Sequence, residues 1–231
     1  MPVPSVRRNH RGRPADLLLR TGPAAVSLHA WVVTGGDPPE PRLLGELAHP
    51  QLIVAADSGA DTAVGLGLRV DVVVGDFDSV SPAGAAAAPE QRRFPPDKDA
   101  TDLALALAEA RDRGAQSLSV VGGSGGRLDH LLANVATLAG DELASLRVDA
   151  LMGSARLWVV RRRETIRGSV GDLLTLLAHG GPAVGVRTSG LRWALEGETL
   201  EAGSSRGVSN VFAAPEATVS LESGVVLAIR P

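Results

Sequence analysis

Several residue types are rare or absent in this chain, and each absence excludes some kinds of site or binding partner. The 231 residues include no cysteine and no tyrosine, and only three phenylalanines and three tryptophans. Without cysteine the protein forms neither disulfides nor thiolate metal sites, which agrees with the cytoplasmic location that we expect. Few aromatic faces and a net charge of −3 argue against a nucleic-acid partner. No apolar run approaches the roughly 18 residues of a membrane span, so we expect no membrane association.

What is present is the composition of a globular protein with a sizeable core, 44% hydrophobic and 21% charged. Residues 1–23 differ from the rest, because they carry five arginines and no organised apolar stretch. The apolar stretch 17–19 is too short for a secretory signal. We interpret residues 1–23 as a disordered, solvated basic tail, with an arm that binds a polyanion as the alternative.

Residues 24–152 alternate short apolar runs with helix-like segments. Strands are expected at 26–33, 52–56, 70–74, 118–121 and 148–152, and helices at 41–48, 61–66, 102–113 and 128–139. This alternation predicts an α/β domain in which helices flank a parallel sheet and nucleotides bind beyond the carboxyl ends of the strands. The stretch 83–88 is expected to be a short helix or a loop.

Residues 153–231 have the texture of an all-β unit. Strand-like runs separated by glycine-bearing turns occur at 156–160, 173–177, 184–188, 191–195, 218–221 and 225–229. We therefore expect a smaller β-sandwich domain to follow the α/β domain.

Asp76 and Asp78 follow the apolar run 70–74 and Gly75. If the chain stays extended past Gly75, the period of two places both carboxylates on one side of it. Two such close charges favour a bound cation, and a Mg²⁺ that also meets substrate phosphates suits the pattern. The alternative is a pair of ordinary turn acids at the end of a strand.

The neighbouring strand ends in Asp57-Ser58-Gly59, where a carboxylate and backbone N–H groups can meet a nucleotide; capping of the next helix is the alternative for Asp57. Residues 94–102 form a polar loop ahead of the helix at 102–113. Thr101 or Asp99 can cap that helix and Asp102 complements its dipole, but Lys98 is best explained as a charge for a phosphate.

Residues 122–126, Gly-Gly-Ser-Gly-Gly, follow a strand and precede a helix, which is typical of an anion site. The segment is neither a Walker loop nor a dinucleotide fingerprint. Arg127 can clamp phosphate, whereas Asp129 and His130 can either serve the site or form a capping pair.

Three residues stand out in the β region. Trp193 can offer its face to a cationic or aromatic ligand, with a place in the core as the alternative. Ser209 and Asn210 can hydrogen-bond the edge of a heterocycle.

As an ordered set, these motifs closely resemble the thiamine pyrophosphokinase family over residues 32–229. The set is Asp57-Ser58-Gly59-Ala60, Gly75-Asp76-Phe77-Asp78-Ser79, Lys98-Asp99-Ala100-Thr101-Asp102, Gly126-Arg127-Leu128-Asp129-His130 with Asn134, Gly190-Leu191-Arg192-Trp193, and Ser209-Asn210. Departures are modest: Ser58, Val70 and Asp97 stand where the family often has Gly, Pro and Glu, and residues 174–176 match loosely.

The resemblance implies transfer of pyrophosphate from ATP to the hydroxyl of thiamine, giving thiamine diphosphate and AMP. It also implies a homodimer with sites at the subunit interface. Asp76, Asp78 and Asp102 would be Mg²⁺ ligands, with Asp102 also a candidate to accept the hydroxyl proton, while Lys98 and Arg127 would stabilise charge on the phosphates. By the same resemblance the residues at the nucleotide are Asp57, Ser58, Gly59, Asp76, Thr101, Gly126, Arg127, Asp129 and His130. Those at thiamine are Trp193, Ser209 and Asn210.

Three rival functions stay open at this point. A related pyrophosphokinase could act on a pterin alcohol, although Trp193 with Ser209 and Asn210 favours thiamine. A Mg²⁺-dependent phosphatase of the haloacid dehalogenase type could use Asp76 and Asp78, but it needs a later pair of strand-end acids, and we find none after His130. A regulatory nucleotide-binding module should have lost an acidic or basic residue of the set, and none is lost.

Overall fold

The computed structural model describes residues 27–231. The basic tail expected at residues 1–23 and the beginning of the strand expected at 26–33 lie outside the described residues. In chain order the elements are β1 (His29–Val33), η1 (Pro41–Glu46), β2 (Leu52–Ala56), α1 (Gly59–Gly65), β3 (Val72–Gly75), α2 (Pro82–Ala85), β4 (Glu90–Arg93), α3 (Asp102–Asp112), β5 (Ser117–Val121), α4 (Leu128–Leu138), η2 (Asp141–Leu143), β6 (Arg147–Met152), β7 (Ala155–Val160), β8 (Arg163–Arg167), β9 (Leu173–Ala178), β10 (Ala183–Ser189), β11 (Glu196–Leu200), β12 (Asn210–Val211), β13 (Glu216–Ser220) and β14 (Val226–Arg230).

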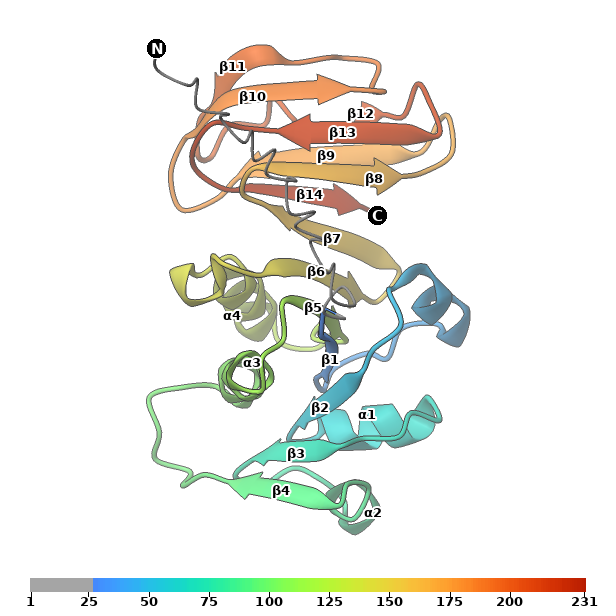
Figure 1. Ribbon diagram of the computed structural model, residues 1–231, viewed down its shortest axis with the longest axis vertical. Helices are drawn as coiled ribbons and strands as arrows, with labels where there is room; N and C mark the ends of the chain where they lie inside the picture. Colours follow the sequence, from blue (N-terminus) through green and yellow to red (C-terminus); the bar gives the residue numbers. More distant parts are fainter. Residues whose placement is uncertain (1–26) are drawn as a thin grey trace, which may run out of the picture.

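One large sheet extends along much of the molecule (Figure 1). Its strand order is β12-β9-β14-β7-β6-β5-β1-β2-β3-β4, and a second sheet has the order β11-β10-β13-β8. Strands β4, β3, β2, β1, β5 and β6 pair in parallel, whereas β7, β14, β9 and β12 continue the same sheet in antiparallel fashion. The expected mixed α/β fold with a β-rich second part is confirmed.

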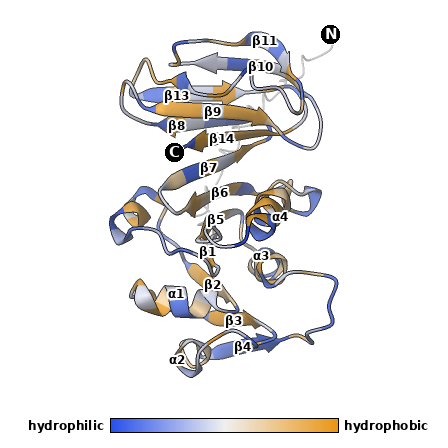
Figure 2. Cartoon of the chain, turned by 180° about the vertical axis from the view of Figure 1, so that it is seen from behind, coloured by the Kyte–Doolittle hydropathy of each residue, from blue (hydrophilic) through white to orange (hydrophobic). Residues whose placement is uncertain are grey.

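The parallel strands are apolar throughout because both of their faces are buried. Alternate residues of β2 point to opposite sides: Val54 packs in the core beneath α3 and α4, and Ile53 packs in the core beneath α1 and η1. Figure 1 shows α3 and α4 on one side of the sheet and α1 on the other. Figure 2 shows the contrast between hydrophobic β2 and β3 and hydrophilic β4, the edge strand.

The β-rich part shares the large sheet with the α/β part. In β14, Leu227 faces the core that includes α3 and α4 residues, whereas Val226 and Ala228 face the four-stranded sheet. Phe212, 1% exposed, lies in this second core. The domain limits 24–152 and 153–231 stay a proposal; they divide the chain between β6 and β7, which pair with each other.

The structure differs from the sequence-based expectations in several elements. The strand expected at 191–195 is wrong: Leu191 forms a single bridge to Phe212, and the chain bends after Gly190, whose φ is +75°. Helices α1, α3 and α4 occur close to their expected positions, and the 41–48 segment forms a 3-10 helix. Strands β4, β8 and β11 were not expected, because their sequences are rich in charged residues.

Within residues 27–231, no helix has both the length and the apolar character that crossing a membrane requires.

Candidate active site

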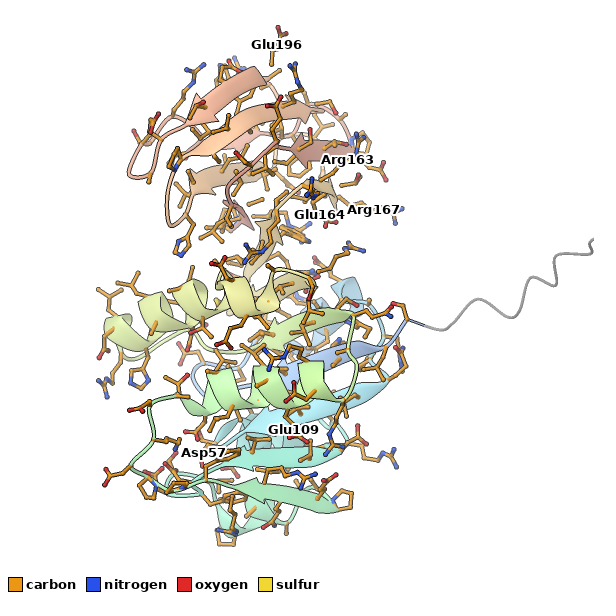
Figure 3. All side chains as sticks on the ribbon, turned by 60° about the vertical axis from the view of Figure 1, so that its left-hand side comes forward. Asp57, Glu109, Arg163, Glu164, Arg167 and Glu196 are labelled. Carbon is orange, nitrogen blue, oxygen red and sulfur yellow. The ribbon has the colours of Figure 1, made fainter. Side chains whose placement is uncertain are left out.

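A cleft of about 510 Å³ lies beyond the carboxyl ends of β1, β2 and β5. Loops 34–36, 57–58 and 123–127 line it, together with residues of α4 and the segment 96–103 that leads into α3. Figure 3 shows Asp57 at this edge of the sheet, near the loop that precedes α3. The cleft occupies the place where open parallel sheets bind ligands.

Asp57, Asp76 and Asp78 converge at this edge, with one carboxylate oxygen from each within 4.8 Å of the others. The extended backbone expected after Gly75 is wrong, because Phe77 has a φ of +66° in the left-handed region. The Asp78 N–H donates to Asp76 Oδ1 at 3.3 Å. A turn at Phe77, and not the two-residue period of a strand, therefore brings the two carboxylates together.

The Phe77 ring is partly buried against the core beneath α1. The Arg93 guanidinium lies 4.0 Å from the centre of this ring. A left-handed backbone costs a bulky residue free energy of order 1 to 3 kcal/mol, so such conformations persist only where their surroundings hold them. Packing and the cation–π contact supply that support here.

Asp57 is 5% exposed and has a φ of +44°. Its Oδ2 accepts a hydrogen bond from the Ser79 hydroxyl, and its backbone N–H donates to Val74 O at 2.8 Å. Its Oδ1 is buried and has no hydrogen-bond partner within residues 27–231. Ser58, and not Asp57, holds the N-cap position of α1, and no side chain in the described part of the chain caps that helix. The capping alternative for Asp57 is therefore wrong, and its free oxygen is available to a ligand.

Lys98 links two of the predicted carboxylates. Its Nζ lies 2.5 Å from Asp76 Oδ2 and 3.1 Å from Asp102 Oδ1. The hydrogen bond from Lys98 lowers the pKa of Asp76, and the same bond raises the pKa of Lys98. Burial raises the pKa of Asp102, although Lys98 opposes that effect. The site thus holds an ionised Asp76, a protonated Lys98 and a carboxylate at Asp102 that accepts a proton more readily than usual.

Two predicted nucleotide residues have clear structural roles. Thr101 caps α3, since its Oγ1 accepts from the Ala104 N–H at 3.2 Å. Gly59 packs so closely on β1 that a Cβ there would lie 2.2 Å from Val33 O. Thr101 also lines the cleft, as does Ser58, the residue before Gly59. The contact of these residues with a nucleotide stays a prediction.

The glycine loop 122–126 forms the opposite wall of the cleft and leads to α4. Arg127 and Asp129 form a two-point ion pair, with Nε–Oδ1 at 3.1 Å and Nη2–Oδ2 at 2.5 Å. This pair lowers the pKa of Asp129 to about 2. Among the residues that the structure describes, no side chain caps α4, so the capping alternative for Asp129 and His130 is wrong. Gly126, Arg127 and His130 line the cleft, whereas Asp129 reaches it only through Arg127.

The residues predicted to bind thiamine lie in the β-rich part, away from this cleft. Trp193 is 55% exposed between β10 and β11, and Arg192 lies 4.9 Å from its ring. Asn210 is the first residue of β12, and Ser209 directly precedes it with a φ of +57°. In Figure 3, Glu196, the first residue of β11, lies at the opposite end of the molecule from Asp57.

Sequence reasoning missed the place of Asp57 among the clustered carboxylates, and it missed Ser79 and Asn134 as supports. Asn134 donates to Gly123 O at 3.1 Å, which ties α4 to the glycine loop. Strands β2 and β3 pair in parallel, so their carboxyl ends, which Asp57 and Asp76 follow, lie side by side. An expectation that these two strands are neighbours would have predicted the place of Asp57.

Comparison with known proteins covers both parts of the chain. Residues 45–148 match the family model described as "Thiamin pyrophosphokinase, catalytic domain", and residues 161–226 match "Thiamin pyrophosphokinase, vitamin B1 binding domain". Thiamine pyrophosphokinase of Bacillus subtilis is 23% identical over 196 residues, which cover 82% of this chain and 92% of that protein. Thiamine pyrophosphokinase 1 of Oryza sativa is 25% identical over 199 residues, which cover 78% and 72%.

Solved structures share the fold. The crystal structure of thiamine pyrophosphokinase from B. subtilis has a TM-score of 0.75 at 22% identity, covering 87% of this chain and 98% of its own. The structure of thiamin pyrophosphokinase from Geobacillus thermodenitrificans has a TM-score of 0.73 at 24% identity, covering 88% and 97%. With both of its parts matched in order, this chain belongs to the thiamin pyrophosphokinase family.

Proposed function

We propose that this protein transfers the diphosphate group of ATP to the hydroxyl of thiamine, giving thiamine diphosphate and AMP. The observation that carries the proposal is the convergence of Asp57, Asp76 and Asp78 beside Lys98, at the edge of a cleft large enough for a nucleotide. The family membership of both parts of the chain supports the choice of donor and acceptor.

The carboxylate cluster fits a magnesium ion. Asp57 has a buried oxygen without a hydrogen-bond partner among residues 27–231. One carboxylate oxygen each of Asp57, Asp76 and Asp78 lies within 4.8 Å of the others. Oxygen ligands of this kind, completed by substrate phosphates, suit Mg²⁺. Asp57, Asp76 and Asp78 would hold the ion, with Asp102 alongside. When bound, the ion would neutralise charge on the triphosphate.

The remaining groups position the reactants and stabilise charge, which is the main requirement of phosphoryl transfer. Protonated Lys98 offers its charge to the phosphates, and residues at the start of α4 line the same cleft, where the N-terminus of a helix favours an anion. Arg127 can exchange Asp129 for a phosphate, because both side chains are exposed.

The transfer itself needs no covalent enzyme intermediate. The thiamine oxygen bonds to the β-phosphorus of ATP as the bond from that phosphorus to the oxygen bridging the α-phosphate breaks, and AMP leaves. The hydroxyl proton goes to a carboxylate, for which Asp102 is suited because burial raises its pKa.

We also propose a homodimer in which each site combines the cleft of one chain with Trp193, Ser209 and Asn210 of the other. This arrangement is supported by the position of the Trp193 segment, since β11 and Asp57 lie at opposite ends of one chain (Figure 3). Exposed leucines on α4, Leu128 and Leu132, offer apolar surface beside the cleft for a second copy. A cytoplasmic location belongs to the same proposal, because ATP is the donor.

The rival functions have less support. The match of residues 161–226 to a vitamin B1 binding domain favours thiamine over a pterin alcohol. A phosphatase would need a later pair of strand-end acids beside the cluster. Asp149, a carboxylate after His130, lies in β6 and instead bonds Ser119 and Arg156.

The experiment is a product analysis with three acceptors. The purified protein is incubated with ATP and Mg²⁺, together with thiamine, a pterin alcohol or no acceptor. We expect AMP to accumulate with thiamine only, in step with thiamine diphosphate. AMP formed with the pterin alcohol, or inorganic phosphate released without an acceptor, would contradict the proposal.

A further inference from the structure

The side-chain oxygen of Asn210 is fully engaged by the protein itself, and its amide nitrogen makes one further hydrogen bond. It is 6% exposed, and its Oδ1 accepts from the N–H groups of Trp193 at 3.1 Å and Val211 at 2.9 Å. Its Nδ2 donates to Trp193 O at 2.7 Å. An amide oxygen has two lone pairs, so Oδ1 has no capacity left for a substrate. Both backbone polar groups of Trp193 are therefore held by a single buried side chain.

The rest of the Trp193 segment is anchored to the same strand. The Arg192 N–H donates to Val211 O and the Ala213 N–H donates to Gly190 O, each at 2.8 Å. At its other end, the Leu195 N–H donates to Thr188 Oγ1 at 2.8 Å. This fixed backbone carries a Trp193 side chain that is 55% exposed. Because the Arg192 guanidinium lies over the ring, one face of the indole is occupied by the protein's own cation.

We infer that Asn210 is a positioning residue for thiamine, which fixes the backbone of Trp193 so that the exposed indole is ready for the acceptor, and that its side-chain oxygen makes no bond to the acceptor. The inference rests on the proposed function. It changes the role first expected for Asn210, which was to bond the edge of the heterocycle. If the Trp193 side chain is already ordered in the free protein, binding does not have to pay the entropy of ordering it. Loss of Asn210 should therefore weaken the binding of thiamine and leave the KM for ATP unchanged.

A double-mutant cycle tests this inference. Asn210→Asp keeps both accepted bonds and replaces the bond to Trp193 O by repulsion between two oxygens, and Trp193→Ala removes the indole. The dissociation constant for thiamine is measured by calorimetry with Mg²⁺ and a non-hydrolysable ATP analogue, and KM for ATP by turnover. We expect Asn210→Asp to weaken thiamine about tenfold in the wild-type background and less than about twofold in the Trp193→Ala background. Equal weakening in both backgrounds would show a direct contact and overturn the inference.

Thr188→Val is the matched control, because it removes a hydrogen bond from the same segment at Leu195 and leaves Trp193 untouched. We expect it to lower the unfolding midpoint as Asn210→Asp does, with thiamine affinity unchanged within about twofold. An equal loss of thiamine affinity in both variants would indicate a general structural role and contradict positioning by Asn210.

A measurement without thiamine separates this inference from the proposed function. With Trp31 and Trp158 replaced by phenylalanine, Trp193 is the remaining tryptophan. The time-resolved anisotropy of its fluorescence should show a larger fast component after Asn210→Asp. Unchanged anisotropy would overturn the positioning role, whereas a wild-type protein that binds no thiamine would overturn the proposed function and leave the anisotropy result standing.

Discussion

At the scale of single residues, the free oxygen of Asp57 and the charge of Lys98 define the chemistry. A buried carboxylate oxygen without a hydrogen bond is costly unless a ligand satisfies it. The carboxylates of Asp76 and Asp78 and the ammonium of Lys98 complete the site, which therefore contains both negative and positive groups. Each charged group therefore has a separable role that substitution can test.

Asp78 offers the cleanest residue-level test, because it is exposed and its loss should cost little stability. We expect Asp78→Asn to lower kcat roughly a hundredfold to a thousandfold, since it removes a carboxylate that would hold the magnesium ion against the phosphates. Circular dichroism and the melting temperature should match those of the wild type. Asp112→Asn, at the far end of α3, is the control and should keep full activity. Near-normal turnover of Asp78→Asn would refute the metal assignment.

The order in which Asp102 and Asp76 titrate gives a pH prediction. As pH falls, Asp102 should take up its proton above the ordinary value of 3.8, because burial raises its pKa. Asp76 should do so only below 3.8, because Lys98 stabilises its charge. The stability contributed by Asp76 is therefore present above pH 3.8 and lost as pH falls through its folded pKa. Carbon NMR of labelled aspartates measures the pKa of Asp102 and of Asp76. In the Lys98→Met variant the pKa of Asp76 should rise. If Asp76 took up its proton at a higher pH than Asp102, the assignment would be contradicted.

At the scale of elements, α1 depends on a close approach that only glycine permits. A Cβ at Gly59 would meet Val33 O at 2.2 Å, whereas no atom of residues 27–231 that could clash lies within 4 Å of a Cβ at Gly65, in the same helix. We expect Gly59→Ala to destabilise the fold by about 1 to 3 kcal/mol. Gly65→Ala, the matched control, should stabilise it by about 0.4 to 1 kcal/mol. Urea unfolding measures both, and a neutral Gly59→Ala would show that α1 can move away from β1.

The elements also show how far the sequence alone reaches. Strands β2 and β5 and helices α3 and α4 follow from apolar periodicity, because they have one or two buried faces. Strand β4 was missed, since its Glu-Gln-Arg-Arg sequence pairs only at the edge of the sheet. The convergence of Asp76 and Asp78 was predicted for the wrong reason. The left-handed turn at Phe77 depends on tertiary packing and on Arg93, which no local pattern reveals.

At the scale of the whole molecule, Glu196, three residues after Trp193 of the proposed acceptor site, and Asp57 at the cleft lie at opposite ends of the chain (Figure 3). Strands β7, β14 and β9 connect these parts by pairing in one continuous sheet, so the chain cannot simply fold the two sites together. The shared site that we propose for a homodimer would resolve this separation.

Subunit mixing tests the shared site. Asp78→Asn removes the cleft's function and Trp193→Ala weakens the acceptor element, so neither pure variant has an intact site. After the two are unfolded and refolded together, each mixed dimer should regain one intact site, restoring about a quarter of wild-type activity at equal amounts. A refolded mixture no more active than the average of the pure variants would place the whole site within one chain.

The most direct test of the central claim is to count the products of the wild-type protein and of Asp78→Asn side by side. With ATP, Mg²⁺ and thiamine, the account predicts that the wild type forms AMP and thiamine diphosphate in equal amounts, and that Asp78→Asn forms almost none of either. ADP with thiamine monophosphate, or equal product from both proteins, would contradict a diphosphate transfer organised by the carboxylates at the edge of the sheet.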